Sequence, residues 1–212
     1  MKFALVSPLG LVIDALPASP LPVDLDLVKE HCAVDGADLD DLLTTYTLAA
    51  IEWAENFTGR TIFRRGHVWI LDNFPQTVCT RIRLPRGLAR SVAQIQYYDG
   101  AGALQTMRGP TGSPVGTDFS ELLTMDDGGV LVPNPVSDAW PDALREAVAP
   151  VQISFEAGWD AADVPQQLLH AILFAVSDML ETRGQADLAA GGPSFETRMA
   201  LASPFMLARF YV

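Results

Sequence analysis

Several features are scarce in this sequence, and each absence excludes a class of protein. Its two cysteines, Cys32 and Cys79, lie far apart and outside any C-x-x-C pair, so we expect reduced, buried thiols and no disulfide scaffold. No window approaches about 18 uninterrupted apolar residues, the length of a membrane span. The histidines occur singly, at His31, His67 and His170, without the ligand spacing of a zinc site. We therefore expect no metal and no membrane association.

Catalytic motifs are also missing. The glycine-rich stretch GPTGSPVG lacks the Lys-Ser/Thr ending of a phosphate-binding loop, and no G-x-S-x-G is present. Acid pairs such as Asp40–Asp41 and Asp126–Asp127 lie where a helix start or a turn is expected, and acids are common there for structural reasons. These observations predict a protein that is not an enzyme and that needs no cofactor.

Positive charge is scarce too. The chain has 14 Lys and Arg against 26 Asp and Glu, a net charge of −12 at pH 7. Specific nucleic-acid binding requires a basic surface, so we expect DNA to be repelled rather than bound. The densest basic stretch comprises Arg60, Arg64, Arg65, Arg81, Arg83 and Arg86.

The composition that is present is globular. The chain of 212 residues is 49% hydrophobic, which is enough for a substantial core. Residues 1–22 contain an apolar stretch that loosely imitates a signal peptide, but Pro8, Gly10 and Asp14 interrupt it. We expect an extended N-terminal arm.

Three helices are predicted by apolar residues at helical spacing, at about 24–34, 39–57 and 165–183. In the second helix, Asp38 is expected to cap the N-terminus, and Gly59 is expected to end the helix in a left-handed conformation. The apolar face of this helix comprises Leu39, Leu42, Leu43, Tyr46, Ala49, Ala50, Trp53 and Phe57. That of the third comprises Leu168, Leu169, Ile172, Ala175, Val176, Met179 and Leu180.

Strands are predicted between about 66 and 160, where apolar and polar residues alternate. Asp99–Gly100 and Asp127–Gly128 indicate hairpins, and Gly158 closes a last strand. The role of the loop-rich stretch 101–150 stays open.

The sequence thus predicts an α+β protein that is mainly α, with a helical bundle, a small antiparallel β region and extended terminal arms. A single domain is expected over 23–184. A linker, a short helix and an apolar tail follow over 185–212.

The order of five motifs resembles the head–tail connector (adaptor) family of tailed phages and gene-transfer particles. An acidic helix ends on Thr58-Gly59-Arg60, and the stretches VWILDNFP, IRLPRGLAR, VQISFEAGW and VPQQLLH follow in that order. The resemblance covers roughly residues 20–185. The chain departs from the family pattern at Leu88, where a proline is usual, and the stretch 101–150 is longer than expected.

The resemblance implies a structural protein of the particle, assembled in the bacterial cytoplasm and located at the head–tail junction. Copies form a homo-oligomeric ring of about twelve under the portal protein, and tail-side stopper or tail proteins bind its other face. DNA passes through the channel without specific binding. Of the tryptophans, Trp69, Trp140 and Trp159 are candidates for ring or tail-side contacts, and each has the alternative of a core position.

The C-terminal tail is rich in the residues that dominate protein interfaces. We predict that it docks on the portal, since family members use terminal segments in this way, through Phe205, Met206, Leu207, Arg209, Phe210, Tyr211 and Val212. The alternative is that these residues pack on helices of their own subunit.

Two further functions remain alternatives. A stopper or tail-terminator ring is usually built mainly of β-sheet, which the long predicted helices disfavour. A monomeric ligand-binding domain or hydrolase would use the loops of 101–150.

Overall fold

The computed structural model describes residues 5–6, 10–17, 20–74, 81–107, 119–124, 128–133, 140–141, 150–183 and 194–207. The chain forms two compact units. Unit 1 comprises Met1–Ala15 and Arg64–Gly158, and unit 2 comprises Leu16–Phe63 and Trp159–Val212. The single domain expected over 23–184 is therefore divided between two units.

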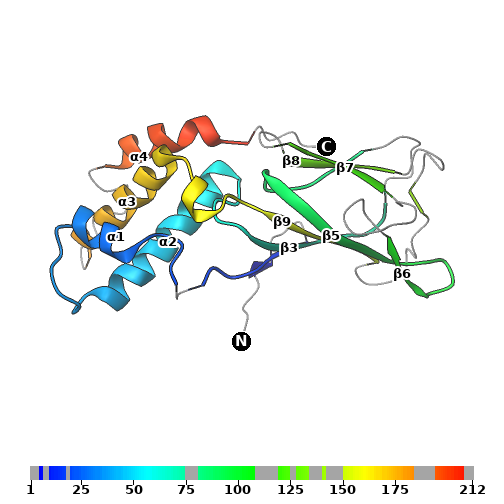
Figure 1. The fold of residues 1–212 in the computed structure, drawn as a ribbon, viewed down its shortest axis with the longest axis horizontal. Coiled ribbons are helices and arrows are strands. Elements are labelled where there is room, and N and C mark those ends of the chain that lie inside the picture. The colour runs from blue at the N-terminus through cyan, green and yellow to red at the C-terminus, as the bar shows by residue number, and fades with distance from the viewer. Residues whose placement is uncertain are drawn as a thin grey trace. The chain divides into compact units, whose positions relative to one another are not determined.

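Unit 1 contains an antiparallel sheet of six strands in the order β1-β2-β3-β9-β5-β6. Figure 1 labels β3, β9, β5 and β6 of this sheet. Its strands are β1 (Leu5–Val6), β2 (Leu11–Ile13), β3 (Arg65–Leu71), β5 (Ala89–Tyr98), β6 (Leu104–Met107) and β9 (Val151–Ala157). The central strand β9 alternates strictly, with Val151, Ile153, Phe155 and Ala157 buried. This period of two places every apolar side chain of β9 on the core face.

The N-terminal stretch contributes to this sheet, which corrects the expectation of an arm over 1–22. Leu11 pairs with Trp69 and Ile13 with His67, so β2 is a hydrogen-bonded neighbour of β3. Gly10 makes this approach possible, because it has φ 71° and its carbonyl accepts a hydrogen bond from Ile70 N at 2.9 Å.

A second sheet in unit 1 has three strands in the order β4-β8-β7. These are β4 (Ile82–Arg83), β7 (Phe119–Thr124) and β8 (Gly128–Pro133). Both predicted hairpins form, since β5 pairs with β6 and β7 with β8. The two sheets contribute to one core, which contains Ile95, Phe119, Leu131, Ile153 and Phe155.

Unit 2 is a cluster of helices, labelled α1 to α4 in Figure 1. They are α1 (Leu25–His31), α2 (Asp40–Thr58), α3 (Gln166–Glu181) and α4 (Phe195–Ala202), and 3₁₀ turns occupy Ala161–Asp163 and Ser203–Phe205. Helix α3 packs against both α2 and α4. The core between them contains Leu43, Ile51, Leu168, Ile172 and Val176, all fully buried.

The ends of α2 show one wrong prediction. Leu39, not Asp38, occupies the N-cap position, and no side chain caps the helix there, because a turn that joins Asp40 N to the Ala37 carbonyl begins the helix later. At the other end, Gly59 is left-handed with φ 72°, as predicted.

The α+β class is confirmed. The emphasis on helix is not, because the strands form a six-stranded and a three-stranded sheet with a core of their own. The composition did not reveal this, since several strands come from the loop-rich half of the chain.

Candidate functional site

The C-terminal segment is held in unit 2 by a buried ion pair between α3 and α4. Arg198 Nη1 lies 3.1 Å from Asp178 Oδ2, with side chains only 11% and 6% exposed. The guanidinium also lies over the ring of Trp53, at 4.8 Å from its centroid, and over that of Phe195 at 5.2 Å. These cation–π contacts stabilise the charged guanidinium of Arg198 in a place where water is largely excluded.

Ser194 completes this arrangement at the start of α4. Its hydroxyl donates to Asp178 Oδ2 at 2.7 Å, and its backbone N–H donates to Asp178 Oδ1 at 3.3 Å. Both carboxylate oxygens of Asp178 therefore accept hydrogen bonds from the segment that leads to the tail. The result is a fixed starting point for residues 195–207.

The end of the described tail binds the C-terminus of α2. Arg60 Nε donates to the Phe205 carbonyl at 2.7 Å, and Leu207 N donates to the Thr58 carbonyl at 2.8 Å. The left-handed Gly59 turns the chain between these two partners. We call Thr58-Gly59-Arg60 with its two hydrogen bonds the tail catch. It gives a physical role to the T-G-R motif.

The predicted docking residues are therefore divided. Phe205 packs against the unit 2 core and Leu207 is half-buried, as the alternative interpretation expected for them. Met206, between them, is 47% exposed. Arg209, Phe210, Tyr211 and Val212 lie outside the described residues, and their docking stays a prediction.

The three candidate tryptophans occupy different environments. Trp140 is 6% exposed and stacks on Phe74 at 5.4 Å, so it lies in the core of unit 1, as the alternative interpretation expected. Trp69 and Trp159 are half-buried, against the core of unit 1 and of unit 2 respectively. Their interface role stays a prediction.

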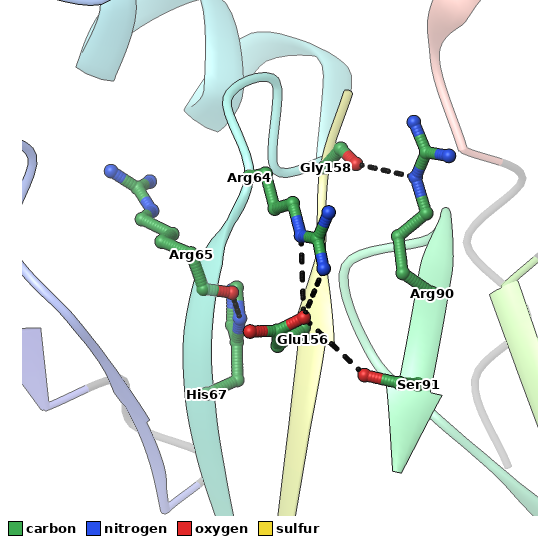
Figure 2. A network of polar contacts seen from close by, with 7 residues as sticks. All are labelled: Arg64, Arg65, His67, Arg90, Ser91, Glu156 and Gly158. Carbon is green, nitrogen blue, oxygen red and sulfur yellow. Dashed lines mark hydrogen bonds and ion pairs between the residues drawn. The ribbon is translucent and has the colours of Figure 1, made fainter. Parts of the chain in front are cut away.

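A second polar site lies in unit 1, at the end of the sheet where β3 and β5 begin and β9 ends (Figure 2). Arg64 Nη2 and Nε contact Glu156 Oε2 at 2.7 and 3.2 Å, and Ser91 Oγ donates to the same oxygen at 3.4 Å. Arg90 Nε donates to the Gly158 carbonyl at 3.1 Å. We call Arg64, Arg65, Arg86 and Arg90 the arginine cluster.

Unusual backbone geometry places two of these arginines. Arg86, Gly87 and Leu88 have successive φ values of 68°, 60° and 46°, in the left-handed region that L side chains rarely adopt. Leu88 is buried, and its carbonyl accepts a hydrogen bond from Gly158 N at 3.2 Å. Arg90 is the extra residue of a β-bulge, because Ala89 pairs with Ala157 and Ser91 already pairs with Glu156.

His67 lies under this site. It is 2% exposed, stacks on Phe155 at 5.0 Å and lies 3.0 Å from the Arg65 carbonyl, to which its Nδ1–H donates. The pKa of His67 is lowered from 6.5 to about 4, mainly by burial and also by the charges of Arg65 and Arg86, whereas the hydrogen bond to the Arg65 carbonyl acts in the opposite direction. The imidazole is therefore neutral at pH 7.

Some of these residues gave no signal in the sequence. Asp178 and Arg198 look like ordinary surface charges of two helices, and only their packing makes them a buried pair. The basic stretch was visible, but Arg90 and the gathering at one sheet end were not.

Within the described ranges, no group of three or more His, Cys, Asp or Glu could hold a metal ion. The helices that the structure describes include none long and apolar enough to cross a bilayer.

Part of this chain is similar to a known protein family. Residues 22–98, which run from just before α1 to the end of β5, match the family model described as Phage gp6-like head-tail connector protein. The resemblance inferred from the sequence is confirmed over these residues. The connector match includes the tail catch residues Thr58-Gly59-Arg60 and the whole arginine cluster. A search of curated proteins gave no match.

The fold is shared with solved particle necks over the full chain. One similar chain is from the neck of an empty GTA particle computed with C6 symmetry, with a TM-score of 0.70 and 18% identity. Others are from the neck of a native GTA particle computed with C12 symmetry, at 0.64 and 21%, and from the virion of a native gene transfer agent particle, at 0.64 and 20%. In each case 100% of this chain and 97% of the other are covered.

Proposed function

We propose that this chain is a structural head–tail connector, located at the junction of head and tail in a phage or gene-transfer particle. The observation that carries the proposal is the full-length fold shared with chains of gene-transfer-particle necks, together with the connector match over 22–98. The function is mechanical and requires no catalytic group, cofactor or metal.

The connector works as a ring of identical copies between the portal and the tail-side proteins. A closed ring requires two different, complementary surfaces on each copy. Structures of similar fold come from necks computed with six- and twelve-fold symmetry, which supports a cyclic assembly. DNA passes through the ring without specific binding, because a net charge of −12 per copy disfavours contact with phosphates.

The tail attaches the ring to the portal. Up to Leu207 the tail belongs to unit 2, where the tail catch and the Asp178–Arg198 pair fix it. We place the docking segment beyond this point, in Arg209, Phe210, Tyr211 and Val212, with exposed Met206 at its base. A fixed starting point limits the conformational entropy lost on docking.

Removal of the gene from a particle-producing host tests the function. We expect heads that contain DNA or are able to package it but that carry no tails, because the neck cannot form. Electron microscopy of purified particles measures this directly. Complementation with the intact chain should restore tails. Complete, tailed particles without the protein would contradict the proposal.

Truncation after Ala208 tests the tail. The shortened chain retains the tail catch, so we expect an unchanged melting temperature but loss of portal binding in a pull-down. The variant Arg60→Met is the matched test of the catch, since it keeps the docking residues and loses the hydrogen bond to Phe205. It should accelerate tryptic cleavage after Arg209. A truncated chain that binds portals as well as the full chain contradicts the assignment.

A further inference from the structure

Charge is divided unequally between the two units. Unit 2 contains fifteen acidic and five basic residues, whereas unit 1 contains eleven and nine. Between positions 60 and 90 there are seven arginines and one acid, Asp72. Copies with a net charge of −12 repel one another, so a contact between them is favoured where opposite charges meet.

The arginine cluster is a constructed feature. The left-handed turn at Arg86, Gly87 and Leu88 costs free energy, and burial of Leu88 together with its bond to Gly158 N maintains it. The bulge redirects Arg90. Backbone strain of this kind concentrates at functional positions. The left-handed turn and the bulge both lie at the same end of the sheet, where Arg64 is exposed beside Glu156.

The complementary surface lies in unit 2. Helix α1 and its connection to α2 carry exposed acids throughout, whereas the one basic residue of this stretch, Lys29, is bound to Asp40 at 2.9 Å. We use the name acidic face for the exposed acids of α1, its two flanks and the first turn of α2, which are Asp24, Asp26, Glu30, Asp35, Asp38 and Asp41.

We propose that the arginine cluster of one copy binds the acidic face of a second copy, and that this contact joins neighbours in the ring. Guanidinium groups suit such a contact, because their planar donors bind carboxylates in a bidentate manner. The two surfaces differ from each other, as a cyclic head-to-tail interface requires. The inference rests on the ring of the proposed function and names the surfaces that form it.

Charge reversal in separate chains tests the contact. One variant is Arg86→Glu, which reverses a charge of the cluster, and the other is the double variant Asp35→Arg/Asp38→Arg, which reverses charges of the acidic face. Self-association of the purified full chain is measured by analytical ultracentrifugation at about 0.01 M salt, where the Debye length is about 30 Å, and at about 1 M, where it is about 3 Å.

We expect the wild type to associate at low salt and to dissociate at high salt. Each variant alone should associate at least about tenfold more weakly, because like charges then face each other. An equimolar mixture of the two variants should recover association, since every contact between unlike chains again pairs opposite charges. The variant Arg183→Glu changes the net charge by the same amount as Arg86→Glu, at an exposed position outside the cluster, and it should not reproduce the loss.

Other results overturn the proposal. A wild type that is monomeric at low salt, or variants that associate normally, would do so. So would recovery only when all three substitutions are in one chain, which indicates a contact within the chain. Binding of double-stranded DNA that Arg86→Glu abolishes would make the cluster a phosphate site instead.

The variant Arg86→Asn is the control for folding, because asparagine tolerates a left-handed backbone and this variant therefore separates loss of charge from misfolding. This experiment uses the purified chain and no particles. A negative result would therefore count against the proposed contact but not against the connector function, which gene removal tests separately.

Discussion

At the scale of single residues, the unusual positions of this chain are polar groups that packing has removed from water. His67 is the clearest, because a titratable ring is stacked on Phe155 inside a sheet. Its Nδ1–H has a partner in the Arg65 carbonyl, so the neutral form is satisfied. Burial disfavours the charged form by more than this hydrogen bond favours it, so the pKa of His67 is lowered.

The stability of unit 1 should therefore depend on pH through His67. The folded pKa is about 4 against an ordinary value of 6.5, so the folded state binds fewer protons than the unfolded state in this range. The contribution is fully present above pH 6.5 and is lost as the pH falls toward about 4, at a cost of up to about 3 kcal/mol. Urea unfolding between pH 8 and pH 4 measures this. The variant His67→Gln should show a flatter profile, and an equal slope in both proteins would contradict the assignment.

At the scale of elements, α4 matters more than its length suggests. A helix of 8 residues is marginal by itself in water, so tertiary contacts must hold it. The Asp178–Arg198 pair, the two hydrogen bonds of Ser194 and the ring of Trp53 supply these contacts. Through α4 they also determine where the tail begins.

Breaking this pair from one side should be costly. Asp178→Asn leaves the buried Arg198 charge without its counter-ion, and we expect a loss of about 3–5 kcal/mol in the free energy of unfolding. Replacement of both partners, as Asp178→Leu/Arg198→Met, should cost much less, since no buried charge remains. Chemical denaturation of the two variants decides this. If the single variant unfolds like the wild type, the pair does not hold α4.

At the scale of the whole molecule, the buried apolar residues that the structure describes form two cores with no member in common. It passes between the units three times, near residues 15, 63 and 158. Unit 1 is therefore assembled from two stretches of sequence, and so is unit 2. Each core can respond to damage separately, as cooperative units within larger proteins do.

Cavity-forming substitutions should act on one unit each. Ile51→Ala opens the core of unit 2 and Ile153→Ala that of unit 1, and both residues are fully buried. Each should cost about 2–5 kcal/mol. Hydrogen exchange followed by mass spectrometry should show reduced protection in α2 and α3 for the first variant, and in β3, β5 and β9 for the second. Equal loss of protection in both units from either variant would mean that the cores unfold together.

The sequence by itself determined the local features of this protein. Helical spacing of apolar residues led to α2 and α3, alternation to β9, and turn residues to both hairpins, because each signal depends on neighbours within a few positions. The order of motifs was enough to indicate the connector family. Asp38 was a wrong cap because a local turn competed with it.

Only the tertiary structure decided which distant segments meet. It brought Leu11–Ile13 to β3, made a core residue of Trp140, joined Asp178 to Arg198 and fastened Leu207 to Thr58. These are contacts between positions far apart in the chain, and their free energy depends on burial and geometry that no short window of sequence contains.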